Sequence, residues 1–201
     1  MTRASFGHPP LRRLGARTTR TTRLLVPCLG LVFAGLLACC SSSAGGTTVA
    51  SQRVQRPLPA GRHASQISRM VCTPRTQREI AETLGVRAAV STPTWTVHAY
   101  SCRYAYRSGA FVLTVKELSS WPQTFAYYAG IGHAQGRTAT IRNLGQGAFQ
   151  TTNGSAIVRK DWKVLTVDIS DLPAQFGRPP TSRGDVAVTV ADLILACWAG
   201  D

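Results

Sequence analysis

Residues 95–117 read WTVHAYSCRYAYRSGAFVLTVKE, the most regular pattern in this 201-residue chain. Within residues 95–106, the small Ala99, Ser101 and Ala105 alternate with four larger side chains, which is the two-residue period of a β-strand. Ser108-Gly109 predicts a tight turn, and Ala110–Glu117 repeats the alternation. We therefore predict two antiparallel strands joined as a hairpin. The larger side chains of the first strand are Tyr100, Cys102, Tyr104 and Tyr106.

Three other stretches carry helix signals. Thr73-Pro74 predicts a helix start, because Thr caps the first turn and Pro has no N–H to leave unpaired, and Gly85 predicts its end. Ser119-Ser120-Trp121-Pro122 starts a second helix in the same way, and Gly130 and Gly132 are expected to end it. The last helix is expected to begin at Ser182 or Asp185, with an apolar face formed by Val186, Val190, Leu193, Ile194 and Cys197.

Strand signals fill the region between the second and third helices. Asn153-Gly154 is a strong hairpin dipeptide between the predicted strands 148–151 and 155–159, and Asp161-Trp162 turns the chain into a strand over 163–169. Residues 170–182 read as a Pro-rich loop. The order is α-β-β-α-β-β-β-α, with short connections that favour antiparallel neighbours. We predict an α+β domain: an antiparallel sheet of about five strands with helices covering one face.

The N-terminal 38 residues read as a signal peptide. They carry six arginines and no acidic residue, and the apolar run Leu24–Ala38 is too short to span a bilayer as a mature helix. Leu36-Leu37-Ala38-Cys39 resembles a bacterial lipobox, so Cys39 is the expected lipidation site. Choosing Cys40 as the anchor would put a cysteine at the preceding position. An ordinary signal cleaved near residues 44–45, or an uncleaved anchor, remains the alternative.

We therefore divide the chain into a signal peptide (1–38), a lipidated Cys with a disordered Ser/Gly-rich tether (39–65), and an α+β domain (66–201). Two acyl chains, palmitate among them, are sufficient for stable anchoring. The predicted location is the outer face of the cytoplasmic membrane, with the membrane itself as a partner. The protein would instead be secreted if the lipobox is not used.

Three cysteines lie beyond the lipobox, at positions 72, 102 and 197, and outside the cytoplasm they can oxidise. We favour a disulfide between Cys72 and Cys102, which closes a loop of about 30 residues and stabilises the domain by roughly 3 kcal/mol. Cys197 would then be a buried thiol on the last helix. Spacing leaves the Cys72–Cys197 pairing open.

A family resemblance covers about residues 70–201. Its elements are Cys72, Leu84-Gly85, Tyr100-x-Cys102-x-Tyr104, Val115-Lys116-Glu117, Leu144-Gly145-x-Gly147-Ala148, Lys160-Asp161 and Cys197-Trp198. In this arrangement the chain resembles small actinobacterial lipoproteins and secreted proteins of unknown function, which join a lipobox to a cysteine-containing α+β domain. The resemblance implies an envelope protein whose first two cysteines pair. It implies no established activity.

Catalytic and metal-binding patterns are weak. The chain has no Gly-x-Ser-x-Gly motif, and His98 and Cys102 would lie about 13 Å apart along one strand. His98 and His133 fall on different elements, and the acidic pair Asp168 and Asp171 lacks the glycine and further oxygens of a calcium loop. We predict neither a cofactor nor an enzyme.

A binding surface is the remaining hypothesis. Aromatic rings can stack on sugars or line a groove, and arginines attract anionic lipid headgroups or cell-wall polymers. Charge alone does not indicate nucleic acid as a partner, because much of the net +14 belongs to the signal peptide. We expect a non-catalytic binding or accessory module of the cell envelope, with a hydrolase of cell-wall or lipid substrates and a structural subunit of an envelope complex as alternatives. The candidate surface residues are Tyr100, Tyr104, Tyr106, Arg103 and Trp162.

Overall fold

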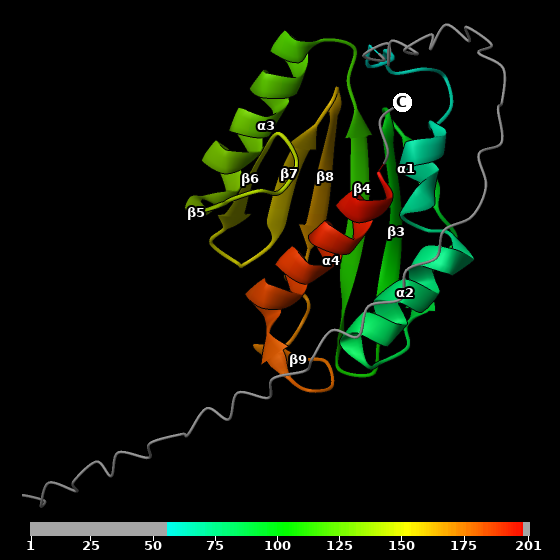
Figure 1. Cartoon of the computed structure of the whole chain (residues 1–201), viewed down its shortest axis with the longest axis vertical. Helices are drawn as coiled ribbons and strands as arrows, with labels where there is room; N and C mark the ends of the chain where they lie inside the picture. Colours follow the sequence, from blue (N-terminus) through cyan, green and yellow to red (C-terminus); the bar gives the residue numbers. More distant parts are fainter. Residues whose placement is uncertain (1–55, 199–201) are drawn as a thin grey trace, which may run out of the picture. The chain divides into compact units, whose positions relative to one another are not determined.

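The fold is described from a computed structural model, in which residues 56–198 are described. The signal peptide, Cys39 and the tether up to residue 55 lie outside this range. Within it, helices pack on an antiparallel sheet (Figure 1), which confirms the predicted α+β class.

One large sheet of eight strands, where we predicted about five, organises the domain. Its order is β1-β3-β4-β8-β7-β6-β5, with β2 also paired to β3, and every pairing is antiparallel. The hairpin predicted from the sequence is β3–β4, near one edge of the sheet. The strands are β1 (Ala89–Val90), β2 (Thr94–Thr96), β3 (Ala99–Tyr106), β4 (Gly109–Glu117), β5 (Arg137–Ile141), β6 (Gly147–Thr151), β7 (Ala156–Lys160) and β8 (Lys163–Asp168).

Four helices and a small second sheet complete the described part. They are α1 (Gln66–Met70), α2 (Pro74–Leu84), α3 (Trp121–Gln135) and α4 (Arg183–Cys197), with β9 (Gln175–Phe176) paired to β10 (Thr181–Ser182). The side chains of Thr73, Ser120 and Ser182 cap α2, α3 and α4 by accepting backbone N–H bonds, as their sequence signatures predict.

The helices cover both faces of the sheet, not one as we predicted. The larger core joins α1, α2 and α4 to the face that carries Phe111, Leu113 and Leu165. Helix α3 packs on the opposite face, against a smaller core of Phe149, Ile157 and Val164. The physical reason is that β6, β7 and β8 are apolar on both sides, so each of their faces needs a cover.

Two predicted boundaries also change. The strand predicted over 95–106 is interrupted at Val97 and His98, whose φ angles of 48° and 56° form the turn between β2 and β3. Helix α3 continues through Gly130 and Gly132 to Gln135. At Gly132 an added Cβ would lie 3.4 Å from the Phe149 ring, so glycine there allows the helix to approach the sheet closely.

The packed region begins before Gln66, where we placed the start of the domain. The backbone N–H of Ala60 donates to the carbonyl of Leu118 at 3.1 Å, and the N–H of Ser65 donates to the buried Glu117 carboxylate at 2.8 Å. The Trp95 indole donates to the carbonyl of Arg62 at 2.9 Å. These bonds hold residues 60–65 against the end of the sheet where β4 finishes.

Candidate functional site

The tyrosines of the predicted surface turn inward. Tyr104 is fully buried, donates its hydroxyl to the Val71 carbonyl at 2.6 Å and stacks on Phe111 with 4.8 Å between ring centroids. Tyr100 lies on the same face of β3 and packs against the same core. Arg103 lies on the opposite face, where it pairs with Asp171 at 3.0 Å. The structure therefore does not assemble the five residues into one surface.

Tyr106 is the member of that set that does line a hollow. It occupies the last position of β3, and its ring makes an edge contact with Phe176 of β9, 4.7 Å between centroids. The Tyr106 ring lines two adjoining hollows, which also share Gly85, Val86 and Arg87 as lining residues. We call the two together the arginine cleft.

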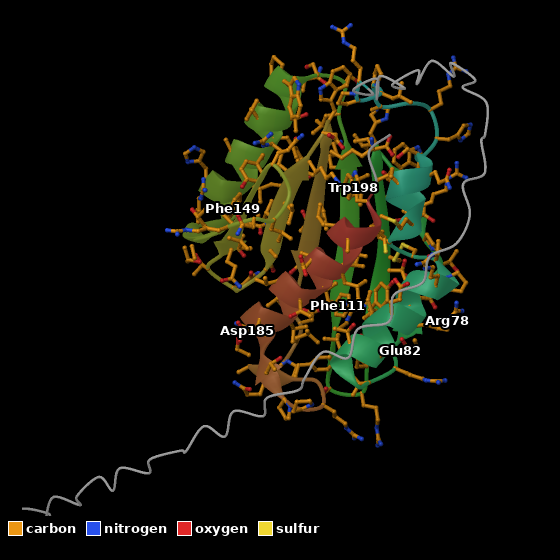
Figure 2. All side chains as sticks on the ribbon, in the orientation of Figure 1. Arg78, Glu82, Phe111, Phe149, Asp185 and Trp198 are labelled. Atoms are coloured by element: carbon orange, nitrogen blue, oxygen red, sulfur yellow. A yellow bond between two sulfur atoms is a disulfide. The ribbon has the colours of Figure 1, made fainter. Side chains whose placement is uncertain are left out.

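The first hollow, the apolar lobe, lies between α2 and the β1 edge of the sheet and has a volume of about 530 Å³. Its wall is mostly aliphatic and aromatic, with Arg78, Glu82 and Gln77 as polar side chains on α2. Arg78 and Glu82 both project from α2 (Figure 2). The apolar members of the wall are Pro74, Ile80, Ala81, Val86, Ala88, Val90, Tyr104 and Tyr106.

The second hollow, the basic lobe, has a volume of about 570 Å³ and lies between the β3–β4 turn and the β9–β10 loop. Arg87, Arg107 and Arg178 line it, and no acidic side chain is among its lining residues. All three arginines are exposed. The ion pairs Arg75–Glu79 and Arg103–Asp171 do not involve a cleft arginine.

Gly85 allows the close backbone contact that forms the wall shared by the two lobes. The backbone N–H of Arg178 donates to the carbonyl of Leu84 at 2.8 Å, which docks the β9–β10 loop on the end of α2. Gly85 has a φ of +65°, and a Cβ there would lie 2.4 Å from the Arg178 carbonyl oxygen. Any larger residue at position 85 would push the loop, and Arg178 with it, away from α2.

Burial raises the pKa of Tyr106 above its ordinary value, so its hydroxyl stays protonated at neutral pH. This hydroxyl is shielded from solvent and has no hydrogen-bond partner among the described residues. The cleft therefore combines guanidinium donors with a neutral phenol and an apolar wall. Such a set can hold an anion.

Trp162 belongs to a different region, the turn between β7 and β8, where its carbonyl accepts a bond from the Leu118 N–H at 2.8 Å. Close by, on the α3 face, the Arg159 guanidinium lies 4.4 Å from the Phe125 ring centroid, 5.6 Å from that of Trp121 and 5.8 Å from that of Tyr128. Because these rings belong to α3 and Arg159 to β7, we interpret the cluster as the support that holds α3 on the sheet.

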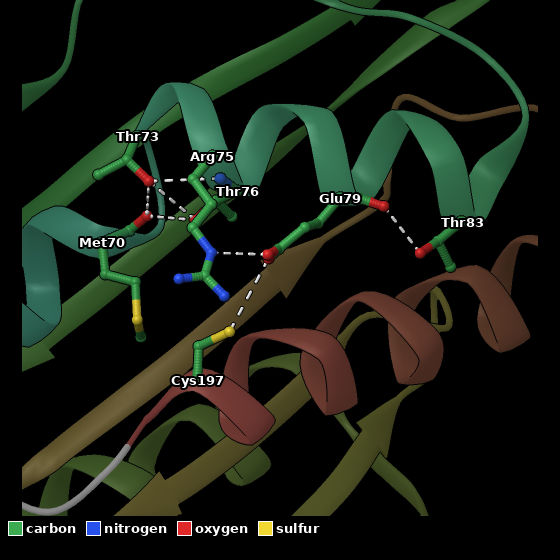
Figure 3. Close-up of polar contacts among 7 residues, drawn as sticks. All are labelled: Met70, Thr73, Arg75, Thr76, Glu79, Thr83 and Cys197. Atoms are coloured by element: carbon green, nitrogen blue, oxygen red, sulfur yellow. Dashed lines mark hydrogen bonds and ion pairs between the residues drawn. The ribbon is translucent and has the colours of Figure 1, made fainter.

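The predicted disulfide between Cys72 and Cys102 is present. Cys197 is not the buried thiol that we expected but a free, exposed one. Its Sγ lies 3.8 Å from Oε2 of Glu79, whose other oxygen pairs with Arg75 at 2.8 Å (Figure 3). Cys197 falls on the side of α4 that faces α2, at the end of the helix, where the core no longer covers it.

The weak catalytic and metal candidates stay apart. Nδ1 of His98 lies 3.1 Å from the Gly61 carbonyl oxygen, and Asp168 accepts bonds from the Ser155 hydroxyl at 3.2 Å and the Ser170 N–H at 3.0 Å. The first two contacts join separate segments of the fold, and the third lies within one turn. Residues 56–198 contain no group of three or more His, Cys, Asp or Glu side chains placed to hold a metal ion.

Sequence reasoning missed the arginine cleft, although Tyr106 was among its candidates. Comparison with protein-family models, with curated protein sequences and with solved structures finds no match for this chain. Within the described residues, no helix has the length and apolar character to cross a membrane.

Proposed function

We propose that this protein is a lipid-anchored binding module of the cell envelope that holds an anionic ligand in its arginine cleft. The lipobox-like Leu36-Leu37-Ala38-Cys39 and the polar stretch after it support the anchored location. The location is the outer face of the cytoplasmic membrane, where oxidation of Cys72 and Cys102 is permitted. The ligand is an anionic lipid or a cell-wall polymer.

The observation that carries the proposal is the group of three arginines around the basic lobe without an acidic neighbour in its wall. Like charges placed around one hollow repel one another, and a bound anion relieves that repulsion. Guanidinium groups also present planar pairs of N–H donors that match the oxygens of phosphate or carboxylate. A site of several hundred cubic ångströms is typical of small-molecule binding.

The test is calorimetric titration of the full-length chain, held in nanodiscs of zwitterionic lipid, with inorganic phosphate and pyrophosphate. We expect binding that weakens with added salt, because the arginines are exposed. The variant Arg107→Glu/Arg178→Glu should lose it. The matched control is Arg142→Glu, an exposed arginine that follows β5 and does not line either lobe. Equal binding by the double variant and the control, or no binding by any chain, would contradict the proposal.

A further inference from the structure

The two lobes differ in chemistry, and their difference defines the class of ligand. We infer that the arginine cleft binds a single amphiphilic molecule, with its phosphate group in the basic lobe and its hydrocarbon chain in the apolar lobe. This inference rests on the proposed function and makes it more specific.

The apolar lobe has the wall that a hydrocarbon chain requires. Ala81, Val86 and Val90 line the lobe and are partly exposed, so they offer aliphatic surface that is still in contact with water. A purely ionic ligand would leave this surface in water, whereas a hydrocarbon chain would remove it from water and gain affinity with each methylene. Glu82 is the acidic member of this wall, which makes the apolar lobe the less suitable one for a phosphate.

The two lobes meet at a shared wall, so one molecule can occupy both. Val86, Arg87 and Tyr106 line each of them. A phosphate bound by the three arginines of the basic lobe would therefore lie beside Val86 and the Tyr106 ring. The hydrocarbon chain of the ligand would pass along these two side chains into the apolar lobe. Arg87 lies at the junction, where its guanidinium can reach the phosphate while its methylene groups contact the chain.

The cleft lies at the end of the domain opposite the incoming chain. Ala60 is bonded beside the end of β4, whereas Tyr106 and Arg107 precede its start. The nine residues of β4 separate the two places by about 27 Å at the rise of an antiparallel strand. The two lobes offer separate walls for a phosphate and for a hydrocarbon chain, which favours a detached amphiphile over a lipid whose chains remain in a bilayer.

The test compares butyl phosphate with octyl phosphate, both below the concentration at which they form micelles, on the full-length chain in zwitterionic nanodiscs. Four additional methylenes, each worth roughly a fourfold gain when fully buried, should strengthen binding at least tenfold in an open lobe. Octanol tests the chain without the phosphate and should bind much more weakly than octyl phosphate. Vesicles of anionic lipid test the bilayer surface as the alternative source of phosphate.

Filling the apolar lobe with a larger side chain should remove the affinity that octyl phosphate gains over butyl phosphate. The variant Ala81→Trp is expected to bind octyl phosphate no more tightly than butyl phosphate. The matched control, Ala134→Trp on the exposed side of α3, should keep the difference. Circular dichroism of both variants establishes that each is folded.

The outcomes separate this inference from the proposed function. If butyl phosphate and octyl phosphate bind equally tightly, and Arg107→Glu/Arg178→Glu abolishes the binding of both, the amphiphile inference is overturned while the proposed anion site stands. Absence of binding by every phosphate would overturn both. Binding to anionic vesicles that requires the same arginines, without binding of monomeric octyl phosphate, would replace the detached ligand with a bilayer surface.

Discussion

Removing the disulfide between Cys72 and Cys102 should cost the domain a large part of its stability. The bridge joins the residue just before the α2 cap to the middle of β3, across a sequence separation of 30 residues. In the chain-entropy description, a closed loop of that length destabilises the unfolded chain by roughly 3–4 kcal/mol. Total stabilities of domains are about 5–15 kcal/mol, so the loss is substantial.

The change is the double substitution Cys72→Ala/Cys102→Ala, with Cys197→Ala as the control. Both bridged cysteines are buried, at 7% and 2% exposure, whereas Cys197 is exposed. We expect the double variant to lose about 3–4 kcal/mol in urea unfolding and about 10 °C in Tm, and the control to change by less than about 0.5 kcal/mol.

The junction of α1 and α2 does not depend on the bridge alone, because the Tyr104 hydroxyl also bonds to the Val71 carbonyl. The double variant should therefore still fold. A loss below about 1 kcal/mol would refute the entropic reasoning. An equal loss in the Cys197 variant would refute the assignment of the bridge, which peptide mapping without reduction checks independently.

Three further predictions concern the α3 support, the buried phenols and the anchor. Arg159→Leu should destabilise the domain by about 1–2 kcal/mol in urea unfolding, because it removes the cation from three α3 rings; a loss no larger than that of Arg142→Leu would contradict the assigned support. Burial raises the pKa of Tyr104, so Tyr104 contributes fully to the free energy of unfolding at every pH below the ordinary tyrosine pKa of about 10. This contribution falls as pH rises above about 10, by up to roughly 1.4 kcal/mol per pH unit, because the unfolded chain loses the phenolic proton first. Tyr104→Phe should flatten this alkaline dependence in urea titrations, and an unchanged slope would exclude Tyr104 as its source. Mass spectrometry of the mature chain should find a diacylated Cys39 at its N-terminus, and Cys39→Ser should abolish acylation; an unmodified N-terminus at another residue would remove the anchor from the account.

Features set by neighbouring residues were predictable from the sequence. The α2 start at Thr73-Pro74 and the hairpin at Asn153-Gly154 form as expected, because capping and tight turns depend on a few adjacent side chains. The β3–β4 hairpin follows from its alternation for the same reason. These local elements account for the correct fold class.

The break at Val97 and His98 could not be predicted, because Val97 is β-branched, suits a strand and disfavours a positive φ. Contacts from elsewhere hold the turn. Lys116 donates to the Val97 carbonyl, and the carbonyl of His98 accepts a bond from the Glu117 N–H at 2.8 Å. The tertiary environment overrides the local preference here.

The cleft was missed for a similar reason. Its arginines, at positions 78, 87, 107 and 178, are spread over 100 residues and resemble ordinary surface charges in the sequence. They meet only because the β9–β10 loop docks on the end of α2 through Arg178 and Leu84. The excess of basic residues in the domain was the available signal, and it did not indicate where they gather.

The location of the ligand can be observed directly from the side-chain Nε signals of the arginines in NMR spectra of the full-length chain. During titration with octyl phosphate, the account predicts shifts for Arg87, Arg107 and Arg178, with Arg137 and Arg142 unchanged. Shifts confined to arginines outside the cleft, or spread evenly over all of them, would contradict the assignment of the cleft as the binding site.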